Sequence, residues 1–300
     1  MTNFLHVNSI SDIHNILNSK MKHPLISVVD LGRVSNPNID LPKVVVGFYG
    51  IIYMPDSNCI WKYGRNQLDF NEGTLIFISP GQTLEIERKD AAEGKQGWAV
   101  FFHPDLLLGT SLKLNKPEYN FFSYDVSEAL HISDKEKRTL NDVVTKIEEE
   151  IDANLDRHSK RLIVSNVELL LNYCIRYYDR QFITREPKNN DIVTQFEQFI
   201  LEYINQDSLI DKGLPSVADC AERLHLSPSY LSDLLKKETG KSTLEHIHYH
   251  IINKAKYILL NSTCSVQEVA FQLGFEYPQS FSKLFKKNVK VSPKQFRNVN

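Results

Sequence analysis

The sequence predicts an α+β protein with two domains, a β-rich N-terminal domain and an all-helical C-terminal domain. Short runs of β-branched and aromatic residues alternate with turn residues up to position 102, and helical patterns follow. Near the C-terminus the same two-helix pattern occurs twice, at 217–237 and 266–286. A chain of 300 residues, 42% of them hydrophobic, is long enough for two separate cores.

The N-terminal half contains a series of expected strands. They are ISVVDL (26–31), KVVVGFYGIIYM (43–54), NQLDF (66–70), TLIFIS (74–79), TLEIER (83–88) and GWAVFF (97–102). Turn residues separate these runs at intervals of about ten residues, which is typical of a sandwich or a small barrel.

Two helical segments follow the strands. The first has a nearly heptad seam, and the second, 162–178, is apolar around much of its circumference. The seam residues are Leu140, Val144, Ile147, Ile151 and Leu155. The segments form either a helical layer packed on the strands or a layer that also makes a dimer interface. Residues 186–190 are polar and are expected to link a domain at 1–185 to one at 191–300.

The two copies of the repeat align along their length with one residue of slack in the turn. Val217 falls on Val266, and Lys236 falls on Lys286. Each copy predicts a short helix, a tight break and a second helix with a basic end. This is the pattern of a helix-turn-helix, whose second helix enters the DNA major groove.

The turns of both copies have suitable local chemistry. Ser216 and Ser265 precede the first helices, where a hydroxyl can cap free backbone N–H groups. Gly274 is expected to supply a positive φ in the second turn. His225 occupies the matching place in the first copy, so that turn is expected to carry some strain.

Between the copies, residues 243–262 form an expected linker helix of about 30 Å. Successive major-groove faces on one side of B-DNA are about 34 Å apart. This match favours double-stranded DNA over a protein as the partner of the two motifs.

The net charge of −2 is divided unevenly. From residue 215 onward there are twelve Lys and Arg against seven Asp and Glu, or +5, and the preceding residues have 23 against 30, or −7. A basic end on an acidic body suits contact with phosphates by that end only.

The four cysteines, Cys59, Cys174, Cys220 and Cys264, are scattered and form no C-x-x-C pair. We expect reduced thiols, with Cys174 and Cys220 in the core, rather than a disulfide framework. No secretion signal and no long apolar run is visible in the sequence, so a cytoplasmic location away from membranes is expected.

Residues 191–300 resemble the DNA-binding domain of the AraC/XylS family of bacterial transcription regulators. The resemblance runs through LSPSYLSDLLKKETGKS (226–242), VQEVAFQLGFEYPQSFSKLFKK (266–287) and VSPKQFR (291–297). EGTLIFISPGQ and GWAVFFHPDLL are similar to the cupin-like arm of that family. The chain departs from the pattern at Ile251, where Arg is usual, and at Lys290, where Gly is common.

The resemblance implies a fold and a function. The fold is a cupin-like β-barrel with a helical dimerisation layer, joined to an all-α domain with two helix-turn-helix motifs and a linker helix. The function is that of a homodimeric regulator of promoter DNA, more often an activator, with RNA polymerase as a partner. A small-molecule effector would bind in the barrel.

The resemblance also implies the residues that contact DNA. Base contacts fall on Ser229, Tyr230, Ser232 and Asp233 in the first motif and on Gln279, Ser280 and Lys283 in the second. Gln279 suits adenine, Lys283 suits guanine, and Asp233 can accept from a cytosine amino group. Backbone contacts are expected at Ser216, Lys236, Lys237, Lys241, Ser265, Lys286 and Lys287.

Three further functions compete with this interpretation. A cupin enzyme needs a metal held by several histidines, but residues 43–110 contain only His103, so no catalytic residue, metal or cofactor is expected. The alternatives are a constitutive regulator with a purely dimerising barrel and a small-molecule-binding cupin protein. His246 and His250 could share a metal, but a solvated helix face is expected.

Five residues are candidates for the lining of an effector pocket, although a plain core or surface position is the preferred interpretation of each. They are Arg33, Tyr49, Tyr53, Trp61 and Trp98.

Overall fold

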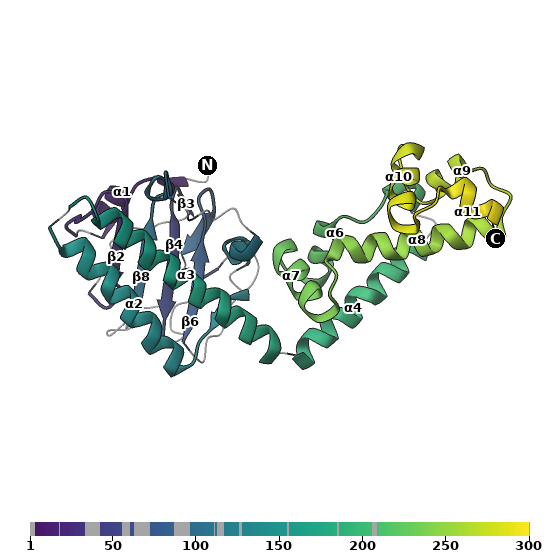
Figure 1. The fold of residues 1–300 in the computed structure, drawn as a ribbon. Helices are drawn as coiled ribbons and strands as arrows, with labels where there is room; N and C mark the ends of the chain where they lie inside the picture. The colour runs from purple at the N-terminus through teal and green to yellow at the C-terminus, as the bar shows by residue number, and fades with distance from the viewer. Residues whose placement is uncertain are drawn as a thin grey trace. The chain divides into compact units, whose positions relative to one another are not determined.

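The structure is a computed structural model that divides into two compact units, Met1–Thr184 and Arg185–Asn300 (Figure 1). It describes residues 4–17, 19–33, 43–55, 61–62, 73–86, 97–110, 112, 117–125, 128–154, 156–184, 186–205 and 209–299.

The strands of the N-terminal unit form two sheets. The first has the order β1 (Phe4–Val7), β3 (Lys43–Val46), β7 (Thr83–Ile86), β5 (Trp61–Lys62), with β1 and β3 parallel. The second is antiparallel, with the order β2 (Ile26–Asp30), β8 (Trp98–Phe102), β4 (Tyr49–Met54), β6 (Thr74–Ile78), β9 (Leu130–His131). No pairing between described strands joins the sheets, so the expected closed barrel is not seen in this part of the chain.

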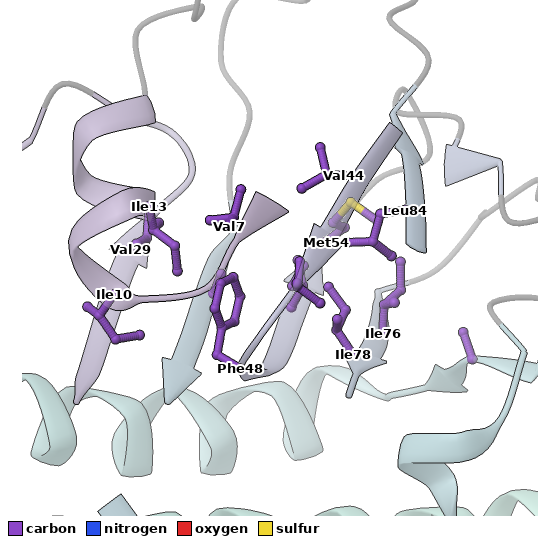
Figure 2. Packing of buried hydrophobic residues seen from close by; sticks show 14 residues of the cluster. Val7, Ile10, Ile13, Val29, Val44, Phe48, Met54, Ile76, Ile78 and Leu84 are labelled. Atoms are coloured by element: carbon purple, nitrogen blue, oxygen red, sulfur yellow. The ribbon is translucent and has the colours of Figure 1, made fainter. Parts of the chain in front are cut away.

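An apolar cluster lies between the two sheets and helix α1 (Ile10–Ile16), as Figure 2 shows. The first sheet contributes residues such as Val7 and Val44, and the second contributes Ile52 and Ala99. Because side chains alternate along a strand, the neighbours of these residues in the second sheet point to its other face. The second sheet therefore has one face in this cluster and one face toward the helices described below.

The expected strands at 26–31, 74–79, 83–88 and 97–102 are confirmed within a few residues as β2, β6, β7 and β8. The run at 43–54 divides into β3 and β4 around Gly47, where a Cβ would lie 2.9 Å from the Cα of Asn8. Glycine is required there because the chain crosses so closely. The strand expected at 66–70 lies outside the described residues.

Helices α2 (Asp134–Asp152) and α3 (Ser159–Thr184) lie side by side across the second sheet (Figure 1). Leu140, Val144, Ile147 and Ile151 of the seam in α2 are all buried within the unit, and Leu155 is not described. The seam is therefore an internal contact of a helical layer, and the prediction of a dimer interface does not apply to these residues.

Short helical turns and the edge strand β9 complete this unit. The turns are η1 (Pro104–Leu107) and η2 (Pro117–Ser123). Gln181 of α3 accepts a hydrogen bond from the His131 N–H at 2.8 Å and donates one to the Ala129 carbonyl at 3.2 Å. A side chain thus takes the place of a further strand at this edge.

The C-terminal unit is helical throughout its described residues. It comprises α4 (Glu186–Asn205), α5 (Leu209–Lys212), α6 (Val217–Leu224), α7 (Pro228–Thr239), α8 (Thr243–Asn261), α9 (Val266–Gln272), α10 (Pro278–Val289) and α11 (Pro293–Val299). Residues 186–190, assigned to a linker from their polarity, form the first turns of α4 instead. Pro187 is compatible with this because a helix tolerates proline in its first turn.

Two apolar clusters divide this unit along α8. The first joins α4, α6 and α7 to the N-terminal half of α8, with Ile251 fully buried in it. The second joins α9 and α10 to the C-terminal half of α8, with Phe281 and Phe285 at its centre. The helix that links the motifs is thus part of both cores, and isoleucine at position 251 fits the first of them.

Cys174 and Cys220 are buried core residues, as predicted. Burial raises the pKa of the Cys220 thiol to about 12, and the nearby Asp219 carboxylate adds to this effect. The thiol is therefore protonated at neutral pH and unreactive.

No helix in the described ranges combines the length and the hydropathy needed to cross a membrane.

Candidate DNA interface

The first motif consists of α6, a left-handed turn and α7. Ser216 caps α6 in a reciprocal pair with Asp219, with N–H to oxygen distances of 2.8 and 3.1 Å. His225 forms the turn with a φ of 57°, a conformation unfavourable for residues other than glycine. The predicted cap and the predicted strained turn are both confirmed.

The second motif, α9 and α10, repeats this construction. Ser265 caps α9 in a reciprocal pair with Glu268. Gly274 forms the turn with a φ of 78°, as predicted. A Cβ at Gly274 would lie 2.7 Å from the Leu209 carbonyl oxygen and 3.0 Å from Gly213. Glycine is needed there for its backbone conformation and for the close approach of α5.

Helix α10 has one exposed face and one buried face. Phe281 and Phe285 are fully buried in the second cluster. The exposed residues recur at helical spacing on the other side; they are Gln279, Ser280, Lys283, Lys286 and Lys287. Residues 277–300 contain six Lys and Arg and no Asp or Glu, so this exposed face lies in a segment of uniformly positive charge.

Helix α7 presents a different surface. Lys236 and Lys237 at its end are exposed, and Ser229 and Asp233 are half-buried. Tyr230 is only 4% exposed and belongs to the interior of the motif. The prediction that Tyr230 contacts bases is therefore wrong for this structure, because its ring is already covered by protein.

Ser232 connects α7 to the start of α8. Its hydroxyl lies 3.0 Å from the hydroxyl of Thr243, which is fully buried. This places Ser232 in a contact that fixes the angle between the two helices. The geometry gives it a positioning role in preference to the predicted base contact.

Lys241 lies in the turn between α7 and α8. Its ammonium group is 4.3 Å from the centre of the Tyr249 ring, and both side chains are exposed. A cation held over an aromatic face keeps its charge at a fixed place on the surface. The arrangement suits the predicted phosphate contact at Lys241.

The solvated face predicted for His246 and His250 of α8 is wrong for His246. His246 is buried, and its Nε2 lies 2.7 Å from the Thr239 hydroxyl at the end of α7. Burial, aided by the charge of Lys241, lowers the pKa of His246. Burial is also the main cause that lowers the pKa values of the half-buried His248 and His250.

His248 of α8 lies close enough to α10 to be affected by the charge of a lysine there. After burial, the charge of Lys287 is the next cause that lowers the pKa of His248. No group of three or more metal-type side chains that could hold an ion occurs in the described residues.

His103 follows β8, and its position matches the structural role predicted for it. Its backbone N–H donates to the Leu25 carbonyl at 2.8 Å, and its Nδ1 accepts from the Asp105 N–H at 3.2 Å. Both bonds fix the chain where the strand ends.

The supports of the motifs were partly missed in the sequence. Ser227 is buried and caps α7 by accepting from the Tyr230 N–H at 3.2 Å. Its signal was visible, since a serine before a proline is a common helix start. Thr239 and Thr243 gave no comparable signal, because their partners come from neighbouring helices.

Known proteins resemble this chain in the region of the two motifs and, in one case, over most of its length. Residues 220–298 match the family described as helix-turn-helix domain. The chain is similar to the arabinose operon regulatory protein of Escherichia coli K12, with 26% identity over 265 residues, 86% of this chain and 83% of that protein. It is also similar to the lactose operon transcription activator of Staphylococcus xylosus, with 29% identity over 36% of this chain and 38% of that protein.

A solved structure, the C-terminal domain of AraT, a response regulator from Geobacillus stearothermophilus, is 31% identical. The match covers 36% of this chain and 85% of that chain with a TM-score of 0.33.

Proposed function

Because this chain belongs to the AraC family of transcription regulators, we propose that it binds promoter DNA sequence-specifically through both motifs. The main support for the proposal is that one continuous helix, α8, packs against the first motif with its N-terminal half and against the second motif with its C-terminal half. The 19 residues of α8 span about 28 Å, close to the 34 Å between successive major-groove faces. Recognition helices α7 and α10 would enter those two faces.

Base reading in the second motif is assigned to Gln279 and Lys283, with Ser280 beside them. All three are exposed; Gln279 and Ser280 lie in the first turn of α10, the end of a recognition helix that reaches base edges, and Lys283 lies one turn further along. A glutamine amide pairs with adenine, and a lysine pairs with guanine. In the first motif, Ser229 and Asp233 occupy the equivalent positions.

Phosphate contacts are assigned to the helix ends. Lys236, Lys237, Lys286 and Lys287 are exposed in the last turns of the recognition helices. Ser216 and Ser265 begin α6 and α9, where backbone N–H groups and the helix dipole favour an anion. These contacts would set the register of the protein on the duplex and contribute no sequence preference.

The N-terminal unit is proposed to carry regulation. The relatives named above are regulators of arabinose and lactose operons, and one is an activator. By this similarity, the chain would activate transcription with RNA polymerase in response to a small molecule. The apolar cluster between the sheets argues against a ligand bound inside that space, and this favours the constitutive alternative for that place in the fold.

A homodimer is proposed through the outer face of α3. Leu162, Leu169 and Ile183 are exposed there by 48%, 39% and 66%, and they are separated by multiples of seven residues. Leu169→Glu is expected to convert a dimer to a monomer in sedimentation velocity. A wild-type monomer, or a dimer in the variant, would contradict this interface.

Fluorescence anisotropy on DNA selected by the protein from a random pool tests the function. Lys283→Ala is expected to weaken binding to the selected DNA by about 1–3 kcal/mol and to relax the preference at one base pair. The matched control is Lys146→Ala, an exposed lysine of α2. Failure to select any sequence, or equal effects of both substitutions, would refute DNA reading by α10.

A further inference from the structure

The two motifs begin their recognition helices differently. Ser227, the residue before α7, is buried, and its hydroxyl accepts from the Tyr230 N–H at 3.2 Å. The equivalent residue before α10 is Tyr277, whose side chain makes no capping hydrogen bond. Both helices start with proline, so they are otherwise built alike at this end. The second motif therefore lacks a cap that stabilises the first.

The turn before α10 is also longer by one residue. A single residue separates the apolar turn position from the proline in the first motif, whereas Glu276 and Tyr277 separate them in the second. Both of these residues are exposed, Tyr277 by 59%. The backbone of Tyr277 is extended, with a φ of −121° and a ψ of 119°. A large aromatic ring is therefore exposed to solvent at the start of a recognition helix.

Tyrosine at this position does not favour folding. The residues that stabilise the start of a helix have short side chains, such as serine, that accept from the free backbone N–H groups. Tyr277 does not do so, and its ring leaves apolar surface in water. Departures from a local rule that bring no gain to the fold occur at functional sites. The position therefore indicates a contact with a ligand.

Tyr277 lies beside the residues assigned to base reading. Gln279 and Ser280 follow it in the first turn of α10, and both are exposed. This end of a recognition helix reaches base edges in the major groove. The carboxylate of the exposed Glu276 would repel a phosphate placed at the same end. A base edge is therefore a better partner for the ring than a phosphate.

The major-groove edges of the base pairs offer one apolar group, the 5-methyl group of thymine. An aromatic ring that covers this methyl group takes both apolar surfaces out of water. The other positions on these edges are hydrogen-bond donors and acceptors, which the face of a ring cannot satisfy. The chemistry of the ring thus selects thymine.

We propose that Tyr277 reads a thymine by packing its ring against the 5-methyl group, close to the base pair read by Gln279. This assignment rests on the proposed function, because it needs α10 in the major groove. It adds an apolar contact to the polar contacts of Gln279 and Lys283. The selected DNA therefore has thymine at one fixed position in the part of the site that α10 reads.

Deoxyuridine, which lacks the methyl group, tests this contact. It replaces each thymine of the selected DNA in turn, and anisotropy measures binding of the full chain. One replacement is expected to weaken wild-type binding about fourfold, the value of one buried methyl group. The same replacement should leave the affinity of Tyr277→Ser unchanged, because the ring is absent. Tyr277→Phe keeps the ring and should keep the fourfold effect.

Stability and DNA binding are expected to change in opposite directions. Tyr277→Ser should bind the selected DNA about fivefold or more weakly. It should need at least as much urea to unfold as the wild type, because serine can cap α10 as Ser227 caps α7. The matched control is Tyr257→Ser. Tyr257 is exposed on the side of α8 opposite Ile252 and Leu259, which belong to the cluster with α10. The control should behave as the wild type on every DNA.

Three results would overturn the assignment while the wild type still binds the selected DNA. They are an equal deoxyuridine effect in the wild type and Tyr277→Ser, easier unfolding of Tyr277→Ser, and a loss of affinity in Tyr277→Phe as large as in Tyr277→Ser. The last result would assign the contact to the phenol hydroxyl. A wild-type chain that selects no DNA would refute the proposed function, and the thymine contact with it.

Discussion

Asp233 and Lys283 occupy equivalent positions in the two recognition helices and carry opposite charges. The lysine is exposed, and the aspartate is half-buried. A carboxylate in the major groove repels phosphates but can accept from cytosine, whereas a lysine attracts phosphates and pairs with guanine. The two motifs are therefore expected to read different base sequences, and the operator half-site should lack an internal repeat.

Substitution of Asp233 tests this difference. Asp233→Ala is expected to tighten binding to non-specific DNA, since a repulsive charge is removed. It should also lose about 1–3 kcal/mol of discrimination at one base pair. Anisotropy with the selected operator and with scrambled DNA measures both effects. A variant that binds scrambled DNA more weakly than the wild type would rule out this role.

His246 makes stability depend on pH. Its pKa is lowered in the folded chain, mainly by burial among groups that include Lys241, Glu197, Glu245 and His250. The unfolded chain, with the ordinary value of 6.5, binds more protons below that pH. The stabilisation is thus present above pH 6.5 and is lost as pH falls toward the folded pKa.

We therefore expect the free energy of unfolding to decrease between pH 7.5 and 5.5, and His246→Gln to reduce that decrease. Urea unfolding at both pH values measures the difference between the two proteins. An identical pH dependence in wild type and variant would contradict the assignment to His246.

At the scale of helices and turns, Gly240 and Gly274 form a matched pair. Both have left-handed backbones, with φ of 75° and 78°, but a Cβ at Gly240 meets nothing within 4 Å. Gly240→Ala is expected to cost about 1–2 kcal/mol for its conformation alone. Gly274→Ala adds a clash with the Leu209 carbonyl and should cost about 2–5 kcal/mol. Equal losses in denaturant unfolding would mean that the contact with α5 is unimportant.

Substitutions at the capping serines can test DNA binding without a large change in stability. Aspartate caps helices about as well as serine, so Ser265→Asp should leave the melting temperature nearly unchanged. Its negative charge should weaken DNA binding if a phosphate lies at the start of α9. Ser133→Asp is the control, because Ser133 caps α2 in the same way with Glu136. Equal DNA affinities of the two variants would remove Ser265 from the interface.

Elements with local signals were predicted well. Capping serines, turn glycine and apolar spacing placed α6, α7, α9 and α10, because these signals lie within a few residues of the structure that they specify. Strand β9 was missed, since the side chain of Gln181, fifty residues away, holds its edge. The start of α4 was missed because its polar first turns resemble a loop in composition.

The site was predicted less completely than the fold. The exposed residues of α10 follow from helical spacing alone, and Gln279 and Lys283 lie where the pattern placed them. Tyr230 and His246 are buried and Ser232 contacts Thr243 of α8, and helical spacing alone does not specify these contacts between helices. Polar residues that tie one helix to another resemble surface residues in a sequence.

At the scale of the whole molecule, the positive charge is concentrated in the part of the chain that contains both motifs, and one helix joins these motifs. The residues from 215 onward carry +5 and the preceding ones −7, so attraction to DNA is concentrated in the segment that contains both motifs. Helix α8 belongs to both apolar clusters of that segment. The two motifs are therefore expected to bind DNA as one rigid unit, with a fixed distance between their recognition helices.

Hydroxyl-radical footprinting on the selected operator tests this central claim most directly. We expect each C-terminal unit to protect two segments on one face of the duplex, about 10 base pairs apart. Gln279→Ala with Lys283→Ala should remove protection from one segment, and Ser229→Ala with Asp233→Ala should alter the other. A single protected segment, or two segments on opposite faces, would contradict a rigid double reader.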